Sequence, residues 1–286
     1  MSLTQHHRLF FLGAGSIGEA MIKGITSASL LPAEQITISN RNNAQRLQEL
    51  RARYAVQLSQ EKMSDIAEAD IVILAMKPFD LVKALREVAP AISQQHLVIS
   101  LVAGVSTELI EDNLPASVPV IRAMPNTSSF VQASSTALCQ GRWATSTHLA
   151  IASDLFSAIG ISVTIPESLM DAATGLSGSG PAYIYYVVEA LLKGGQACGL
   201  SIETCRTLLL QTVYGAAKML QETEQEPAAL RRQVTSPNGT TMAAIEILDQ
   251  GNGQQLFQDA VIRATQRAAE MGQQIEGFNP QQVLGR

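Results

Sequence analysis

The chain has 286 residues, of which 46% are apolar, enough for one large or two ordinary domains with a sizeable core. Its formal net charge is −5 and it lacks a long basic run, so we expect no nucleic-acid partner, because phosphate binding needs clustered Lys and Arg. The longest apolar stretches, 69–76, 97–105 and 183–192, are shorter than the roughly 20 residues that span a bilayer, so we expect no membrane association.

Cysteine and histidine usage predicts the compartment and argues against a metal site. Cys139, Cys198 and Cys205 show no metal-ligand spacing and no even disulfide set, and the four histidines form no zinc motif. Residues 1–7 are polar and lack the apolar core of a secretory signal. We therefore expect a cytoplasmic protein that holds no metal.

The most informative motif, G-x-G-x-x-G, follows the first apolar run, Leu9–Leu12, and leads into a helical pattern over 18–28. The first glycine allows a tight turn, the second leaves room for a pyrophosphate, and the third lets the helix pack closely on the sheet. The first N–H groups of the helix then face the phosphates. We assign the motif to a dinucleotide site made of Gly13, Gly15, Ser16, Ile17 and Gly18. A strand-to-helix turn without a ligand is the alternative.

Apolar runs and amphipathic patterns alternate through the first half, which favours a parallel sheet covered on both faces. The predicted strands are 9–12, 36–39, 71–75, 97–101 and 118–123, and the predicted helices between them are 18–28, 43–53 and 79–89. The runs 135–139 and 161–165 are candidates to extend the sheet.

After Pro166 the apolar runs typical of strands disappear and long helical patterns follow. These cover 181–198, 202–222, 242–250 and 253–272. We predict an α/β protein with a Rossmann-like parallel-sheet domain over 1–165 and an all-α domain over 166–286. Residues 182–192 are apolar on more than one helix face, so they must be buried on more than one side. A second copy of the chain in an interlocked homodimer is the preferred cover, and the chain's own first domain is the alternative.

The end of the second predicted strand indicates which nucleotide binds. An acidic residue there would hold the ribose hydroxyls of NAD and repel a 2′-phosphate. The chain instead has Ser39, Asn40 and Arg41, which offer a hydroxyl, an amide and a guanidinium to a phosphate. We predict that NADPH is preferred and that NADH binds more weakly. The alternative is a helix N-cap by Asn40 or Asn42 beside a solvated Arg41.

Three later loops should also line the cofactor, because ligands bind at the carboxyl ends of parallel strands. They contribute Ala75-Met76-Lys77-Pro78, Ala103-Gly104 and Asn126. We interpret the Lys-Pro pair as a shaped loop whose backbone faces the cofactor, with no chemical role for the Lys77 amine. Asn126 either fixes an amide of the cofactor or closes a turn.

Two runs of small residues, 175–183 and 234–241, each open into a helical pattern in the second half. Pro181 stands where a first-turn proline belongs. Flexible loops of this kind would expose backbone N–H groups that bind carboxylates without an arginine. The alternative for each is an ordinary helix cap.

Together these motifs resemble the pyrroline-5-carboxylate reductase family over nearly the whole chain. The matching segments are Phe11–Gly15, Ala75–Pro78, Arg122–Thr127, Leu176–Tyr183 and Ser236–Thr241. Ser128-Ser129 departs from the family, which commonly has proline next to the asparagine-threonine pair, and Asn238 stands where glycine is frequent.

The resemblance implies NADPH-dependent reduction of the cyclic imine 1-pyrroline-5-carboxylate to L-proline. It also implies a helical dimerisation domain, with dimers often gathered into larger rings such as decamers. By the same resemblance, Ser177, Ser236, Gly239, Thr240 and Thr241 would bind the substrate. The hydroxyl of Thr241 would contact the imine nitrogen and act in catalysis.

Two other functions remain open at this point. A β-hydroxyacid dehydrogenase relative would need a lysine on the first long helix of the second domain, and Lys193 is the only candidate there. A catalytically silent NADP-binding sensor would need no carboxylate pocket. The small-residue runs therefore argue against a sensor.

Overall fold

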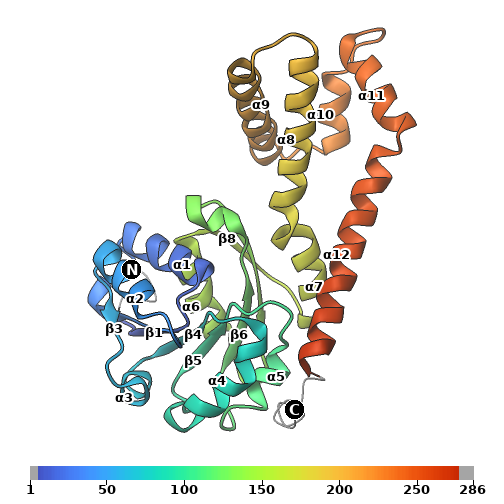
Figure 1. Cartoon of the computed structure of the whole chain (residues 1–286). Coiled ribbons are helices and arrows are strands. Elements are labelled where there is room, and N and C mark those ends of the chain that lie inside the picture. Colours follow the sequence, from blue (N-terminus) through green and yellow to red (C-terminus); the bar gives the residue numbers. More distant parts are fainter. Residues whose placement is uncertain (1–5, 277–286) are drawn as a thin grey trace, which may run out of the picture. The chain divides into compact units, whose positions relative to one another are not determined.

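The computed structural model describes residues 6–276, so most of the polar N-terminal segment and the last ten residues lie outside the described part. Contacts divide the chain into two compact units (Figure 1). The first runs up to Ser179 and resumes at Ile262, and the second is Gly180–Val261. The domain boundary inferred from composition at residue 165 stays a prediction.

The first unit is built on an eight-stranded sheet with the order β3-β2-β1-β4-β5-β6-β7-β8. Its strands are β1 Leu9–Leu12, β2 Ile36–Ser39, β3 Gln57–Leu58, β4 Ile71–Leu74, β5 Leu97–Ser100, β6 Val120–Met124, β7 Ser134–Gln140 and β8 Gly160–Thr164. All pairings are parallel apart from β6 with β7, which is antiparallel. The predicted α/β class is confirmed, and the two candidate runs do extend the sheet. Because β7 and β8 pair in parallel with each other, both run antiparallel to the six strands before them.

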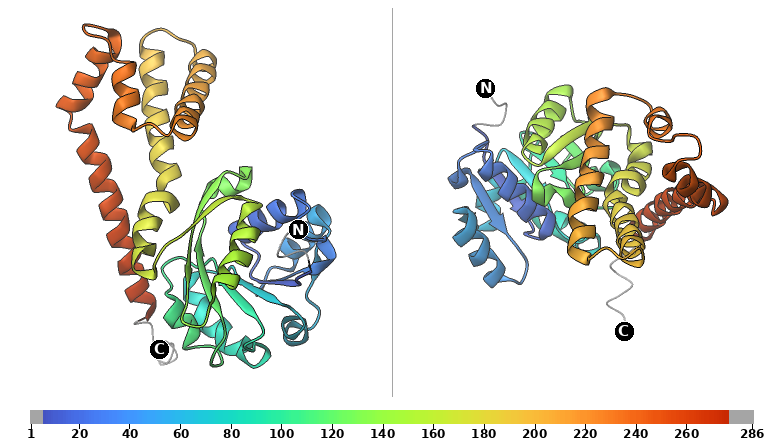
Figure 2. Two further views of the ribbon diagram at one scale, coloured as in Figure 1. Left: turned by 180° about the vertical axis from the view of Figure 1, so that it is seen from behind. Right: turned by 90° about the horizontal axis from the view of Figure 1, so that it is seen from above.

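Successive residues of each strand face opposite sides, and both sides are buried. Phe11 packs in one core with residues from α1 (Ser16–Ser27), α2 (Ala44–Tyr54) and α6 (Ser146–Ser157). Phe10 packs in the other core with residues from α3 (Lys62–Ala67), α4 (Leu81–Val88), α5 (Thr107–Glu111) and the end of α12 (Gly253–Glu276). The sheet is therefore the middle layer of the first unit, as Figure 2 shows from behind.

Short segments connect these elements. They are the 3-10 turns η1 Ala33–Gln35, η2 Pro78–Asp80, η3 Ala89–Ala91, η4 Thr127–Val131 and η5 Glu167–Leu169, then α7 Met170–Ala173 and the π-helical turn η6 Thr174–Gly178. The sequence pattern did not predict β3, α3, α5 or α6. The first three are only two to six residues long, too short to display a period.

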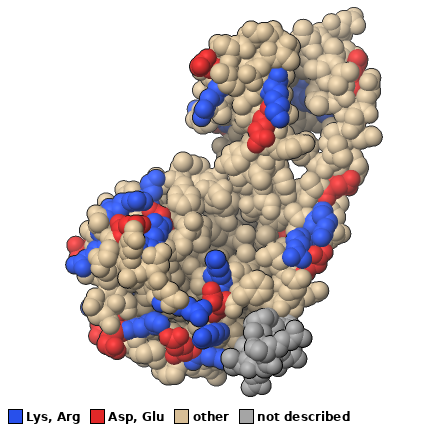
Figure 3. Space-filling model, in the orientation of Figure 1, with Lys and Arg blue, Asp and Glu red and all other residues tan. Residues whose placement is uncertain are grey.

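The second unit is entirely helical. It comprises α8 Gly180–Ala197, α9 Ile202–Thr223, α10 Pro227–Gln233, α11 Thr240–Gln250 and the start of α12. α8 and α9 lie side by side (Figures 1 and 2). Within this unit Cys205 is the only buried residue. The face of this unit that Figure 3 shows is largely uncharged. None of the described helices is long and apolar enough to cross a membrane.

Candidate active site

The strand order of the first unit reverses at β1, because β2 lies on one side of β1 and β4 on the other. Ligands of such sheets bind outside the carboxyl ends of the strands at this point. Gly13 follows β1 there with a φ of +106°, and a Cβ on it would lie 2.5 Å from the carbonyl oxygen of Ala75, which follows β4. Only glycine fits this turn, as the motif predicted.

The beginning of α1 fits a pyrophosphate. Gly15 is the N-cap residue and provides no side-chain cap, so the first N–H groups, including those of Ser16 and Ile17, need another partner. A Cβ on Gly15 would meet nothing nearer than 3.8 Å, which leaves the approach to these groups clear. Gly18 is buried against the Ala75 side chain, 3.4 Å from a would-be Cβ. Uncapped amides and the helix dipole together favour an anion at this point.

The residues after β2 are held by local hydrogen bonds. The buried Ser39 hydroxyl donates to the Phe11 carbonyl at 3.1 Å. The Asn40 side chain accepts from the Asn43 amide at 3.0 Å and donates to the Asn43 carbonyl at 2.7 Å. The N-cap of α2 is Asn43, whose side chain accepts from the Arg46 amide at 2.9 Å. The alternative of a cap by Asn40 or Asn42 is therefore wrong, because Asn40 instead closes the turn before the cap.

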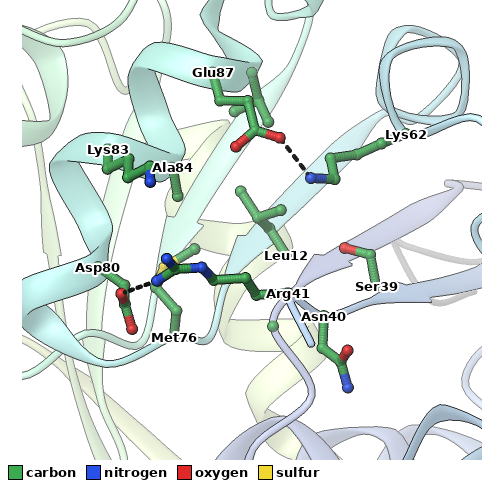
Figure 4. Close-up of a pocket in the computed structure, with 12 residues that line it drawn as sticks. Leu12, Ser39, Asn40, Arg41, Lys62, Met76, Asp80, Lys83, Ala84 and Glu87 are labelled. Atoms are coloured by element: carbon green, nitrogen blue, oxygen red, sulfur yellow. Dashed lines mark hydrogen bonds and ion pairs between the residues drawn. The ribbon is translucent and has the colours of Figure 1, made fainter. Parts of the chain in front are cut away.

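Arg41 lies in a pocket with two further cations and two carboxylates (Figure 4). Its guanidinium is 2.8 Å from Asp80, and Lys62 is 2.7 Å from Glu87. The Lys62 hydrogen bond and charge, with smaller contributions from Lys83 and Arg41, hold the pKa of Glu87 below its ordinary value. Glu87 is therefore ionised at neutral pH, and the three cations and two carboxylates give this pocket a formal net charge of +1.

Sequence reasoning missed four of these charged residues. They are Lys62, Asp80, Lys83 and Glu87. The i, i+4 spacing of Lys83 and Glu87 places them on one face of α4, and this was the available signal. No sequence pattern places that face beside Arg41, because the two segments meet only through the order of the strands in the sheet.

Other predicted cofactor residues also lie at the carboxyl edge of the sheet. Met76 lines the Arg41 pocket, and Lys77 precedes η2, whose first residue is Pro78. After β5, Ala103 leads to Gly104, which has a φ of +70°. The last turns of α12 pack on this loop, since a Cβ on Gly272 would lie 3.0 Å from the Gly104 carbonyl oxygen.

Asn126, just after β6, closes a turn with its side chain. Its Oδ1 accepts from the Ser128 amide at 3.0 Å and so caps η4. Its Nδ2 donates to the Ser177 carbonyl at 3.1 Å. One of the two interpretations of this residue is therefore confirmed, and a contact with the cofactor stays a prediction.

The first small-residue segment differs from the predicted flexible loop. Residues 174–178 form the π-helical turn η6, and the Ser179 amide donates to the Thr174 carbonyl at 2.9 Å. The Ser177 hydroxyl donates to the Ala173 carbonyl at 3.1 Å, so it also belongs to the helical path. Prediction of a loop with exposed amides is wrong here, because the small residues support a widened helical turn. Such turns are rare in proteins, but those that occur often lie at functional sites.

The second small-residue segment does form a turn before a helix. The Gly239 amide donates to the Ser236 carbonyl at 3.0 Å, and a Cβ on Gly239 would lie 2.4 Å from the Ser236 hydroxyl. Asn238 has a φ of 56°, which explains why glycine suits this position and why asparagine is tolerated. α11 begins at Thr240 without a side-chain cap, and Thr241 is half-buried in its first turn. Free amides there can donate hydrogen bonds to a carboxylate.

The predicted residues fall into two groups. Every predicted cofactor residue and Ser177 belong to the first unit, and most lie in loops at one edge of its sheet. Ser236, Gly239, Thr240 and Thr241 belong to the second unit, at the beginning of α11.

Two family models match the chain. Residues 167–271 match one described as pyrroline-5-carboxylate reductase dimerisation, and residues 8–104 match one described as NADP oxidoreductase, coenzyme F420-dependent. The chain is 40% identical over 276 residues to pyrroline-5-carboxylate reductase 1 of Bacillus spizizenii, covering 96% of this chain and 93% of the relative. It is 40% identical over 268 residues to the Methanosarcina acetivorans enzyme of that name, covering 94% and 99%.

Solved structures that resemble this chain bear the same or nearly the same enzyme name. The pyrroline-5-carboxylate reductase of Coxiella burnetii has a TM-score of 0.86 at 35% identity, covering 93% of this chain and 98% of that one. The Plasmodium falciparum pyrroline carboxylate reductase, solved with NADP bound, has a TM-score of 0.83 at 28% identity, covering 94% and 99%.

Proposed function

This chain belongs to the pyrroline-5-carboxylate reductase family, and we propose that it reduces 1-pyrroline-5-carboxylate to L-proline with NADPH. In this reaction a hydride from the nicotinamide would bond to the carbon of the protonated C=N group, and the π electron pair of that group would move to nitrogen. The observation that carries the proposal is the presence of two uncapped helix beginnings in one family member. One follows Gly15 and suits a pyrophosphate, and the other follows Gly239 and suits a small carboxylate.

For the cofactor, we assign the pyrophosphate to Gly13, Gly15, Ser16, Ile17 and Gly18 and the 2′-phosphate to Ser39, Asn40 and Arg41. The pocket around Arg41 supports this assignment, because three cations and two carboxylates leave a formal net charge of +1 there. An anion gains from such a site, whereas a ribose hydroxyl gains much less. We assign the nicotinamide side to Ala75–Pro78, Ala103 and Gly104, at the sheet edge where Asn126 follows β6.

For the substrate, the amides after Gly239 would hold the carboxylate, with Ser236 shaping the turn and Ser177 lining the pocket. The Thr241 hydroxyl would contact the imine nitrogen. A protonated imine is already a strong electrophile, so the protein has to orient it and needs no powerful acid. Positioning can contribute up to about 7–11 kcal/mol in favourable cases. The dehydrogenase alternative has less support, because Lys193 lies near the end of α8 and not at its beginning.

For the assembly, we propose homodimers that gather into rings, in the cytoplasm. The apolar surface of the second unit supports self-association, since Tyr186 is 72% exposed and Tyr214 is 62% exposed in the single chain. A reducing compartment suits Cys139, Cys198 and Cys205, which are free cysteines.

The direct test is oxidation of NADPH, followed by its absorbance, with 1-pyrroline-5-carboxylate and separately with the oxidised forms of 2-hydroxy and 3-hydroxy acids. Turnover with the cyclic imine alone, and proline as product, is the expected result. Turnover with an oxo acid instead would favour the dehydrogenase. NADPH binding without turnover of any substrate would favour a sensor.

A further inference from the structure

The π-helical turn η6 has a physical cause in the sequence. In a regular α-helix the Ser177 carbonyl would accept from the amide four residues later, and that residue is Pro181, which has no N–H. A proline ring also clashes with the carbonyl four residues before it in α geometry. Widening the turn over Thr174–Gly178 relieves that clash, and the Ser179 amide then bonds to the Thr174 carbonyl five residues back. The Ser177 carbonyl still needs a donor.

Asn126 provides that donor from outside the helix, through Nδ2 at 3.1 Å. The orientation of its amide is fixed, because Oδ1 accepts from the Ser128 amide at 3.0 Å. Its backbone is fixed too, because the Asn126 amide donates to the Ser134 hydroxyl at 3.1 Å on the neighbouring strand β7. The Asn126 side chain is thus held in one geometry toward Ser177.

A second contact joins the same strand end to the same turn. Met124, the last residue of β6, packs against Gly178, where a Cβ would lie 2.9 Å from the Met124 Cε. Gly178 therefore allows the turn to approach β6 closely. Ser177 and Gly178 of η6 are thus held by Asn126 and Met124, which lie at the carboxyl end of β6.

We propose that Asn126 is a positioning residue that sets where Ser177 stands relative to the cofactor edge of the sheet. This inference rests on the proposed function, in which Ser177 lines the substrate pocket. β6 ends at the edge where the nicotinamide would lie, so one amide ties the substrate-binding turn to the cofactor-binding edge. The principal role of Asn126 is then toward the substrate and not toward cofactor affinity.

The test is Asn126→Asp, which keeps the oxygen that caps η4 and replaces the donor to Ser177 with a second oxygen. At neutral pH two acceptors face each other, and we expect kcat/KM for 1-pyrroline-5-carboxylate to fall by about tenfold to a hundredfold. The dissociation constant of NADPH, followed by its fluorescence, should change by less than about twofold. As the pH falls, the introduced carboxyl gains a proton and can donate to the Ser177 carbonyl again. The activity of the variant relative to the unsubstituted protein should therefore recover toward acidic pH.

Asn126→Ser is the matched control, because a serine keeps a capping oxygen but is too short to donate to Ser177. It should lose activity without any recovery at acidic pH, and it also replaces Asn126→Asp if that variant fails to fold. An equal loss of NADPH affinity in either variant would overturn the proposal, since the amide would then serve the cofactor. Unchanged kcat/KM in both would overturn it as well.

Hydrogen exchange separates this proposal from the proposed function. Faster exchange of the Ser179 amide in the folded Asn126→Asp variant is expected whether or not the unsubstituted chain reduces 1-pyrroline-5-carboxylate, because the turn would loosen. Unchanged exchange at residues 174–179 would show that Asn126 does not hold the turn. Failure of the unsubstituted chain to turn over the imine would count against the proposed function alone.

Discussion

At the scale of single residues, the proposed pyrophosphate and carboxylate sites would be made by main-chain amides, and each follows a glycine with little space for a side chain. Gly13 is required because a Cβ would lie 2.5 Å from the Ala75 carbonyl oxygen, whereas a Cβ on Gly239 would crowd the Ser236 hydroxyl at 2.4 Å. Thr241 follows the second of these turns directly. Its hydroxyl is the proposed contact of the imine nitrogen. Because Thr241 lies in the first turn of α11, small substitutions of its side chain can test this role.

Thr241→Val keeps the side-chain shape and removes the hydroxyl. A hydrogen bond to a charged group contributes about 1.5–3 kcal/mol, so turnover should fall by about tenfold to a hundredfold. NADPH affinity and the circular dichroism spectrum should stay unchanged, and Thr241→Ser, which keeps the hydroxyl, should retain most of the activity. Unchanged turnover of the valine variant would remove Thr241 from the mechanism.

Arg41→Met tests the choice of cofactor. Loss of the guanidinium should weaken NADPH binding by about tenfold or more and leave NADH binding nearly unchanged, because only NADPH carries the 2′-phosphate. Titration calorimetry with 2′,5′-ADP and 5′-AMP measures the same difference without turnover. Arg86→Met is a suitable control, since Arg86 lies on α4 and bonds to Asn113 outside this pocket. Equal weakening of both nucleotides by Arg41→Met would contradict the assignment.

At the scale of elements, a buried carboxylate joins α1 to α2. Glu19 is 7% exposed and is bonded by Arg46, by Arg53 at 2.5 Å and by the Tyr54 hydroxyl at 3.0 Å. Burial raises the pKa of Glu19, but the hydrogen bonds from Arg46 and Tyr54 and the two arginine charges outweigh it, so that the pKa lies below its ordinary value. The arrangement holds α2, which follows the Arg41 loop, against α1, which begins at the proposed pyrophosphate site.

The pKa of Glu19 predicts how stability depends on pH. Because the pKa is lower in the folded chain, the ionised group stabilises the fold above the ordinary value of 4.5, and this contribution is lost as the pH falls below it. Glu19→Gln should therefore lower the free energy of unfolding by about 1–2 kcal/mol at pH near 7, with a smaller difference at acidic pH. Urea unfolding at fixed protein concentration measures both. A difference independent of pH would show that the charge is not involved.

The elements also show what sequence patterns can predict. Strands such as 9–12 and 36–39 were predicted with correct ends, because runs of buried apolar residues stop at the turns. The antiparallel direction of β7 leaves no trace in composition, since a buried strand reads alike in both directions. η6 was mistaken for a loop, because small residues are typical of loops and the effect of Pro181 is on a carbonyl four residues earlier. The ion pairs around Arg41 depend on sheet order, which no local pattern contains.

At the scale of the whole molecule, the two units differ in how they are stabilised. The first has a core on each face of its sheet. The second has one buried residue, Cys205, while large apolar side chains such as Ile184, Tyr186, Leu208 and Ile247 are more than half exposed. A helical unit with so little burial cannot offset the entropy of ordering its chain. We therefore expect it to be folded only when a second copy covers it.

This expectation predicts that assembly and stability change together. Light scattering after size-exclusion chromatography should give at least twice the chain mass of 30.6 kDa. Tyr186→Glu places a charge on a side chain that is 72% exposed in the single chain, and it should reduce the assembled mass and lower the Tm of the helical unit. Gln48→Glu adds the same charge on the exposed face of α2 and should change neither. A stable monomer that unfolds in one cooperative step at micromolar concentration would show instead that the chain covers these helices by itself.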